Sequence, residues 1–252
     1  MEILLEVQDL TKIFSLENGI DRTVVDHVTF QIKQGETLGL VGESGCGKST
    51  LARMITRLAE PSEGSVKLQG KDITKCRGKE LRDAYQQMQM VFQSPAGSFD
   101  PRKNIGYGIE ESMKNNGIPK SERSQRAAAL LETCGLPIEF ASRYPYEISG
   151  GQCQRAAIAR ALAIQPKLLI CDEATSALDV TVQQQIMEML KKLKQEKGLS
   201  FLFICHNLAL VQSFCDRVLV MHEGKIVETG MTDQVIQNPR SEYTRRLVEA
   251  AF

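Results

Sequence analysis

Residues 42–49 read Gly42-Glu43-Ser44-Gly45-Cys46-Gly47-Lys48-Ser49, which fits the phosphate-binding pattern G-x-x-x-x-G-K-S/T. An apolar run at 37–41 precedes this stretch, and apolar residues at helical spacing follow it over 48–58. A strand, a glycine-rich loop and a helix in this order are the context that the pattern requires. The glycines let the backbone approach phosphate oxygens closely, and a helix N-terminus attracts the anion. The sequence therefore predicts a phosphate-binding loop at residues 42–49.

The composition argues against several classes of protein. The chain has 252 residues, and its 31 Lys and Arg residues balance 31 Asp and Glu residues, so the formal net charge is zero. We expect no nucleic acid as partner, because nucleic-acid binders usually carry a basic excess. No apolar run approaches the ~20 residues that cross a bilayer, and the first residues lack a signal-peptide pattern. We therefore expect no transmembrane segment, so that any role at a membrane needs partner subunits.

Strand and helix patterns alternate along most of the chain. Alternating or continuous apolar residues predict strands at 3–7, 23–32, 37–41, 65–68, 88–92, 168–171, 201–205, 217–221 and 225–228. Helical patterns predict helices at 48–58, 153–163 and 182–196, and a short basic helix within 239–252. Residues 94–163 are helical in pattern, with a helix that Ser121 can cap and that Gly135 and Pro137 end. These patterns predict an α/β fold with a mainly parallel sheet and a helical insertion.

Two acids, Asp172 and Glu173, directly follow the apolar run at 168–171. An acid at the carboxyl end of a parallel strand lies at the edge where α/β proteins bind ligands. We expect Asp172 and Ser49 to hold Mg²⁺, and Lys48 to neutralise the β- and γ-phosphates. Glu173 is expected to orient and polarise the attacking water for hydrolysis. The alternative interpretation is a pair of solvated acids that caps the next helix.

Residues 148–152 read Ile148-Ser149-Gly150-Gly151-Gln152 and precede the helix expected at 153–163. Ser149 and the two glycines make a second helix start that can accept an anion. A second such element makes sense if it closes over the nucleotide of another subunit. With this signature stretch the sequence resembles the ATP-binding-cassette (ABC) ATPases, whose pattern is L-S-G-G-Q. The resemblance covers nearly the whole chain, with Ile148 as a mild departure.

Further motifs of that family follow in the family's order. Gln93 resembles the Q-loop glutamine that reaches Mg²⁺, and Asp179 belongs to a stretch, 176–179, that resembles the D-loop. His206 resembles the switch histidine that contacts the γ-phosphate. Phe14 falls where the family places an aromatic residue on adenine, although a core position is the alternative. The resemblance implies that ATP is bound by Phe14 and by Gly42, Glu43, Ser44, Gly45, Cys46, Gly47, Lys48, Ser49 and Thr50.

The resemblance implies a P-loop NTPase fold of ABC type, with an antiparallel β subdomain and a helical insertion beside the mainly parallel sheet. Residues 1–252 would form one ATPase domain. Its core would comprise 1–93 and 164–252, the helical subdomain 94–163, and a short C-terminal tail 238–252. Two cassettes would pack head to tail and clamp two ATP molecules with Mg²⁺. In each site, Glu173 and His206 would act in catalysis, and the other cassette would contribute Ser149, Gly150, Gly151 and Gln152.

Three stretches resemble the ATPases of oligopeptide, dipeptide and nickel importers: 92–102, 172–183 and 238–247. Such importers commonly use two ATPases, and residues 42–53 resemble the second of the pair. This implies import of peptides, nickel or cobalt, or metal–chelator complexes, at the cytoplasmic face of the plasma membrane. Two permease subunits, a related ATPase or a second copy, and indirectly an extracytoplasmic binding protein would be the partners. The alternatives are a soluble ABC ATPase acting in translation or DNA repair, an exporter cassette and an inactive regulatory cassette.

Overall fold

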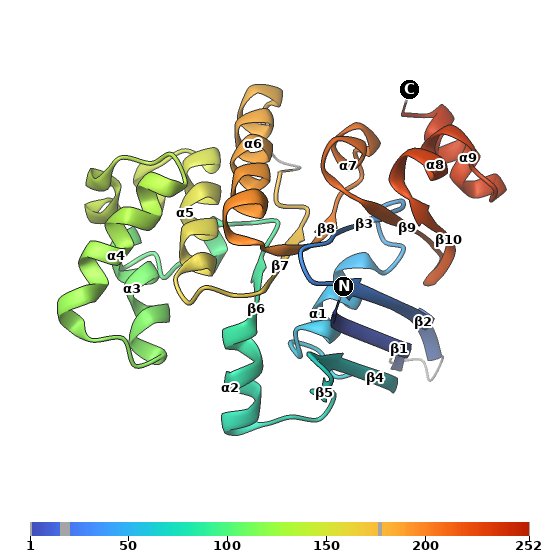
Figure 1. Ribbon diagram of the computed structural model, residues 1–252, viewed down its shortest axis with the longest axis horizontal. Coiled ribbons are helices and arrows are strands. Elements are labelled where there is room, and N and C mark those ends of the chain that lie inside the picture. The colour runs from blue at the N-terminus through green and yellow to red at the C-terminus, as the bar shows by residue number, and fades with distance from the viewer. Residues whose placement is uncertain (1, 16–20, 176–177, 252) are drawn as a thin grey trace.

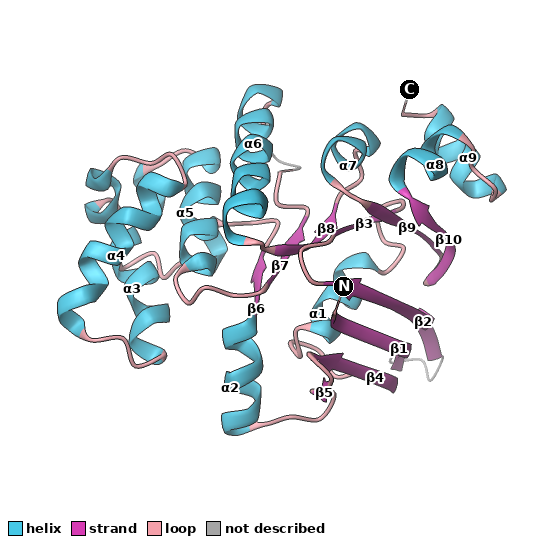
Figure 2. Ribbon diagram, viewed as in Figure 1, coloured by secondary structure: helices cyan, strands magenta, loops and turns pink. Residues whose placement is uncertain are grey.

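The computed structural model describes residues 2–15, 21–175 and 178–251, and within them six strands form one central sheet (Figures 1 and 2). The strand order is β10-β9-β3-β8-β7-β6. The strands are β3 (Thr37–Val41), β6 (Met88–Val91), β7 (Leu168–Asp172), β8 (Ser200–Ile204), β9 (Arg217–His222) and β10 (Lys225–Met231). Neighbouring strands are parallel except for the antiparallel pair of β9 and β10. The mainly parallel sheet predicted from the sequence is therefore confirmed.

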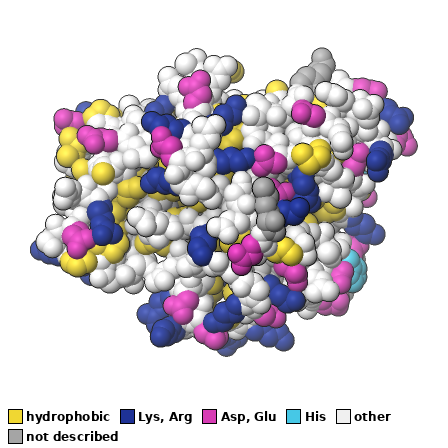
Figure 3. All heavy atoms as spheres, in the orientation of Figure 1, with side chains coloured by type: hydrophobic (Ala, Val, Ile, Leu, Met, Phe, Trp, Pro, Cys, Tyr) yellow, Lys and Arg dark blue, Asp and Glu magenta, His cyan; other side chains and the backbone are white. Residues whose placement is uncertain are grey.

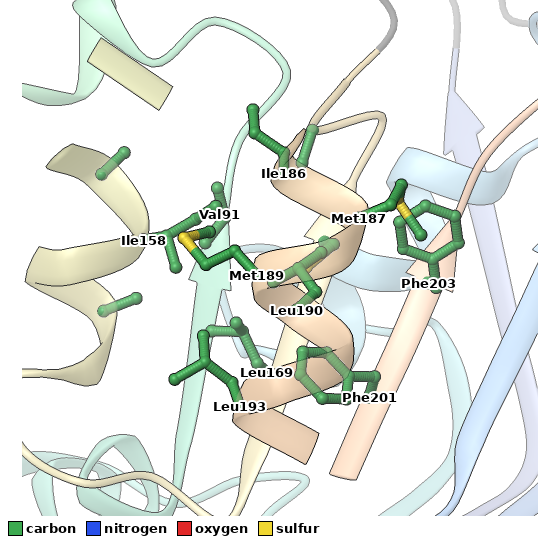
Figure 4. Packing of buried hydrophobic residues seen from close by; sticks show 14 of the residues in the cluster. Val91, Ile158, Leu169, Ile186, Met187, Met189, Leu190, Leu193, Phe201 and Phe203 are labelled. Carbon is green, nitrogen blue, oxygen red and sulfur yellow. The ribbon is translucent and has the colours of Figure 1, made fainter. Parts of the chain in front are cut away.

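The central strands β3, β8 and β7 are buried along their whole length. A strand that is covered on both faces has no polar side, which is why these strands read as almost continuous apolar runs. Helix α6 (Val180–Lys197) covers one face of the sheet. Figure 4 shows Met187 and Leu190 of α6 in one buried cluster with Phe201 and Phe203 of β8. This packing holds α6 on the sheet.

A second sheet, with strand order β2-β1-β4-β5, is antiparallel throughout. It consists of β1 (Ile3–Ser15), β2 (Asp21–Lys33), β4 (Glu63–Leu68) and β5 (Lys71–Asp72). Its buried face shares a core with α1 (Lys48–Ile55) and with the central sheet, since one buried cluster contains Leu5, Leu51 and Ile204. The shared core joins the antiparallel sheet to the central sheet.

The chain between β6 and β7 forms helices, which lie on the left in Figure 1. They are η1 (Ala96–Ser98), α3 (Ile105–Asn115), α4 (Lys120–Thr133), η2 (Ile138–Ser142), η3 (Pro145–Glu147) and α5 (Gly150–Leu162). One prediction in this region is wrong, because Pro119 rather than Ser121 occupies the N-cap of α4. Proline has a fixed φ and no N–H to leave unpaired, so it suits the start of a helix. The helix ends before Gly135, which has a φ of 70°.

Other helices differ from the predictions for identifiable reasons. The helix expected at 48–58 is too long, since α1 ends at Ile55 and Arg57 adopts a φ of 60°, which a right-handed helix cannot contain. The sequence patterns missed α2 (Gly78–Gln87), α7 (Leu208–Phe214) and α8 (Thr232–Gln237). Helix α2 places Leu81 and Ala84 against the buried cluster at helical spacing, but Ala84 is the one buried residue within the helix, so its apolar pattern is short. The last helix is α9 (Glu242–Glu249). None of the helices in the described part of the chain combines the length and apolar character that a bilayer-spanning segment needs.

Candidate functional site

Several of the residues expected at the site lie at or just beyond the ends of three strands that are adjacent in the sheet, β3, β8 and β7. The phosphate-binding loop follows β3, and His206 follows β8. Asp172 is the last residue of β7, and Glu173 comes directly after it. Because β3, β8 and β7 are parallel, their carboxyl ends meet at one edge of the sheet. The topology therefore gathers chain segments from three distant parts of the sequence.

The phosphate-binding loop requires glycine at two positions. Gly42 has a φ of 152°, and a Cβ there would lie 2.1 Å from the backbone oxygen of Met221. Gly47 has a φ of 111°, and a Cβ there would lie 2.5 Å from the backbone oxygen of Val24. A side chain at either position would collide with backbone atoms, so the loop can keep this path only with glycine.

The Lys48 side chain is buried at the centre of this loop, with 4% of the residue exposed. Its Nζ donates hydrogen bonds to the carbonyl oxygens of Gly42 and Glu43, both at 2.8 Å. A buried ammonium group needs such partners or an anion to offset the loss of water. The loop therefore holds a positive charge where the sequence motif predicts that phosphate oxygens bind. The residues fit a nucleoside triphosphate.

Ser49 and Asp172 are in direct contact, because the Ser49 hydroxyl donates a 3.0 Å hydrogen bond to Oδ1 of Asp172. Burial raises the pKa of Asp172 above its usual value and the neighbouring Glu173 adds to the rise, although the hydrogen bond from Ser49 opposes it. A bound cation would offset this cost, and hydroxyl and carboxylate oxygens are the ligands that Mg²⁺ prefers. The oxygen donors of Ser49 and Asp172 therefore fit a magnesium ion.

Hydrogen bonds to β8 and to Gln93 help to position Glu173. Its amide donates a 3.0 Å hydrogen bond to the carbonyl oxygen of Ile204 at the end of β8, and its Oε2 accepts a 2.9 Å hydrogen bond from Nε2 of Gln93. Glu173 also has a φ of 48°, which non-glycine residues seldom adopt. Such backbone strain is typical of functional positions. His206 is exposed and lies two residues beyond Ile204.

The signature stretch forms the start of α5. The Ser149 hydroxyl accepts a 3.3 Å hydrogen bond from the amide of Gln152, and Oε1 of Gln152 accepts a 2.9 Å bond from the amide of Ser149. This reciprocal capping explains why the helix begins here. Ser149 and Gly150 are exposed. Helix α5 packs against α3 and α4, whereas α1 packs against β2 and β7, so the signature stretch and the phosphate-binding loop belong to different parts of the molecule.

Two further predicted residues, Asp179 and Phe14, lie at the start of α6 and on β1. Asp179 occupies the N-cap of α6, where its carboxylate accepts a 3.0 Å hydrogen bond from the amide of Val182. Residues 176–177 of the predicted D-loop lie outside the described residues. Phe14 is 43% exposed on β1, so the alternative of a core position is wrong. Its ring is accessible, with Nζ of Lys12 5.0 Å from the ring centroid.

The sequence did not predict that Tyr243 contacts the phosphate-binding loop. The Tyr243 hydroxyl accepts a 3.0 Å hydrogen bond from the amide of Glu43, and its ring stacks on His222 with a centroid distance of 3.9 Å. The sequence resemblance covers the tail that contains Tyr243 but assigns no role to it, and His222 matches no motif. Only the folded chain brings these residues to the loop.

Comparisons with known proteins agree with this arrangement. The family model for the ABC transporter family matches residues 25–176. The chain is 47% identical to a probable peptide ABC transporter ATP-binding protein of Sinorhizobium fredii, over 99% of this chain and 73% of that protein. It is 45% identical to the oligopeptide transport ATP-binding protein OppF of Salmonella typhimurium, over 99% of this chain and 78% of that protein. It is also 43% identical to a glutathione import ATP-binding protein of Pectobacterium atrosepticum, over 99% of this chain and 41% of that protein.

Solved structures show the same fold. A bacterial ABC transporter cassette solved as a dimer has a TM-score of 0.84 and 29% identity, over 91% of this chain and 99% of that chain. A dimeric cassette in a post-hydrolysis state, bound to ADP and Pi, has a TM-score of 0.83 and 29% identity over the same shares. The matches over nearly the full length, together with the phosphate-binding loop and the acids at the end of β7, show that this chain belongs to the ABC transporter family as one of its ATP-binding cassettes.

Proposed function

We propose that this chain is the ATP-hydrolysing subunit of a membrane importer for peptides. The observation that carries the proposal is the juxtaposition of two hydrogen-bonded pairs, Ser49 with Asp172 and Gln93 with Glu173, beside the buried amine of Lys48. These side chains supply a cation that binds phosphate, oxygen ligands for a metal ion, and a carboxylate that can polarise the attacking water. Such groups at one edge of a sheet are the recurring parts of phosphoryl-transfer sites.

Each of these residues has a proposed role in binding or hydrolysis. Lys48 binds the β- and γ-phosphates of ATP, while Ser49, Gln93 and Asp172 would hold Mg²⁺, which when bound neutralises charge on those phosphates. Glu173 orients and polarises the attacking water.

The remaining site residues act around this centre. His206 contacts the γ-phosphate, and Phe14 stacks on adenine. Asp179 holds the start of α6 close to the signature stretch, where Gly151 and Val182 meet.

The working site is proposed to span two chains. Ser149 and Gly150 are exposed at the start of α5, in a different part of the molecule from Lys48. In a head-to-tail pair they would contact the nucleotide held by the other cassette, and this contact would favour the closed pair when ATP is bound. A second copy or a related ATPase could supply the other half. The dimeric cassettes among the similar structures support this arrangement.

Peptide import at the cytoplasmic face of the membrane is the proposed role in the cell. The relatives support it, since they include ATP-binding proteins of oligopeptide, dipeptide and glutathione transport. Their names disfavour a soluble ATPase of translation or DNA repair and an exporter cassette. Lys and Arg side chains are interspersed with Asp and Glu over the face shown in Figure 3, which agrees with the absence of nucleic acid among the proposed partners.

Native co-purification tests this function. The chain would be tagged, the membranes solubilised gently, and the associated proteins identified by mass spectrometry, with the untagged strain as the control. We expect two multi-span permease subunits and a second ATP-binding cassette, with a peptide-binding protein attached. Recovery of ribosomes or DNA-repair proteins, or of no membrane protein, would contradict the proposal.

A further inference from the structure

The C-terminal tail reaches the phosphate-binding loop through Tyr243. Tyr243, in the first turn of α9, is 7% exposed. Its hydroxyl oxygen lies 3.0 Å from the amide nitrogen of Glu43, which is 200 residues away in the sequence. The Tyr243 ring stacks on His222, at the end of β9, with an angle of 24° between the rings. Two independent contacts therefore fix the side chain against the loop.

The peptide unit that Tyr243 contacts also contacts Lys48. The N–H of this unit, on Glu43, donates to the Tyr243 hydroxyl, and its carbonyl, on Gly42, accepts a 2.8 Å hydrogen bond from Nζ of Lys48. The peptide is planar and trans, so its N–H and C=O point in opposite directions. Tyr243 and Lys48 therefore form hydrogen bonds with opposite edges of one rigid peptide unit. Any rotation of that unit would disturb both hydrogen bonds.

The start of α9 is itself anchored to the sheet. The carboxylate of Glu228, on β10, accepts hydrogen bonds from the amides of Arg240 at 2.9 Å and Ser241 at 3.0 Å. A negative charge at a helix N-terminus is stabilising. The turn between β9 and β10 contacts the phosphate-binding loop as well, since the amide of Gly224 donates a 3.0 Å bond to the carbonyl of Cys46. The β9–β10 hairpin thus fixes both α9 and the loop.

We propose that Tyr243 is a positioning residue for the phosphate-binding loop, and that through it the C-terminal tail sets the affinity of the cassette for ATP. By fixing the Gly42–Glu43 peptide, Tyr243 fixes the carbonyl that holds the Lys48 amine. The amine is then already placed when the phosphates arrive, so less ordering is needed on binding. This inference rests on the proposed binding of ATP at the loop.

The test is the variant Tyr243→Phe in the full chain. Phenylalanine keeps the ring that stacks on His222 and removes only the hydroxyl oxygen. Hydrolysis would be blocked by the Glu173→Gln background, and the Kd for ATP with Mg²⁺ would be measured by calorimetry. We expect the Kd to rise about two- to tenfold, which corresponds to one net hydrogen bond. In the chain that carries Tyr243→Phe and keeps native Glu173, the KM for ATP should rise while kcat changes little.

Matched controls separate this role from a general loss of structure. Tyr107→Phe changes a half-exposed tyrosine on α3 and should leave the Kd unchanged. Glu228→Gln loosens the start of α9 without touching the loop, and should raise the Kd in the same direction as Tyr243→Phe. An unchanged Kd in both Tyr243→Phe and Glu228→Gln would overturn the inference, and so would an equal rise in Tyr107→Phe. If the chain with native Tyr243 bound no ATP, the proposed function itself would fail.

Discussion

The side-chain amide of Gln93 donates a 2.9 Å hydrogen bond to the carboxylate of Glu173, although the two residues are 80 positions apart in the sequence. They meet because Gln93 follows β6, Glu173 follows β7, and the two strands pair in parallel. Beyond Gln93 the chain continues into the helices between β6 and β7, the first of which, η1, begins at Ala96. The proposed base is thus in contact with the border between the sheet and the helices that carry the signature stretch.

Replacing Glu173 with glutamine should separate ATP binding from hydrolysis. Glutamine keeps the size of the side chain but removes the carboxylate that polarises water, and such a group contributes roughly 10²–10⁴-fold to a rate. We expect phosphate release to fall by this factor while the Kd for ATP, measured by calorimetry, stays close to that of the native chain. Phosphate release at the native rate would show that another group acts as the base.

The contact between the signature stretch and α6 predicts an effect on stability. A Cβ on Gly151 would lie 2.5 Å from Cγ1 of Val182, whereas a Cβ on Gly150 would meet only Cδ2 of Leu178, at 3.7 Å. Gly151→Ala should therefore lower the free energy of unfolding by about 1–3 kcal/mol, because overpacking outweighs the better helix propensity of alanine. Gly150→Ala is the control and should not destabilise the chain. Urea unfolding measures both, and equal stability of the two variants would disprove the close packing.

Asp179 should stabilise the start of α6 as an acceptor of a hydrogen bond. Asp179→Ala removes the bond to the Val182 amide and should lower the free energy of unfolding by about 1 kcal/mol. Asp179→Asn keeps an oxygen acceptor and should retain native stability, since asparagine caps helices as well as aspartate does. Thermal unfolding of the two variants checks this. Equal losses in both would indicate that the charge, rather than the cap, stabilises the helix.

The lowered pKa of the Glu228 carboxyl group predicts that the stability of the fold depends on pH. Burial alone would raise the pKa of Glu228, but the hydrogen bonds that it accepts, including those from Arg240 and Ser241, lower the pKa below its usual value of 4.5. The folded chain thus binds this proton more weakly than the unfolded chain does. Glu228 therefore stabilises the fold above pH 4.5, and this contribution is lost as the pH falls through the lowered pKa.

Comparison with Glu228→Gln isolates this contribution, because glutamine does not titrate. Above the usual pKa of glutamate, the native chain should be more stable than the variant in urea unfolding. The difference should shrink as the pH is lowered through the acid range. A difference that stayed constant from neutral to acid pH would contradict the assigned role of the carboxylate.

The sequence predicted those elements whose burial leaves a clear pattern. Strands β3, β7 and β8 are fully buried, so their apolar runs mark them to within one residue. Helix α2 has a short apolar pattern of Leu81, Ala84 and Tyr85, and α7 has only seven residues, so both helices were missed. The end of α1 was missed because a left-handed residue such as Arg57 has no signal in a helical pattern.

Local motifs likewise predicted the neighbours of the phosphate-binding loop better than its distant contacts. Ser49 and Asp172 were expected to share a metal ion, and their side chains are 3.0 Å apart. Tyr243 could not be assigned to the loop, because its contact with Glu43 depends on how α9 sits on the β9–β10 hairpin. Spacing along the chain carries no information about such a tertiary contact.

In the proposed function, ATP is clamped between this cassette and a second one. ATP retention is measured by passing the native complex with radiolabelled ATP through gel filtration, with Glu173→Gln in this chain and the matching glutamate of the second cassette replaced in the same way. We predict that this complex retains ATP and that adding Ser149→Arg to this chain releases the ATP held by the other cassette, although the isolated chain with Ser149→Arg still binds ATP as the native chain does. Undiminished retention with Ser149→Arg would contradict the claim, because the nucleotide would then be held without the signature of a second cassette.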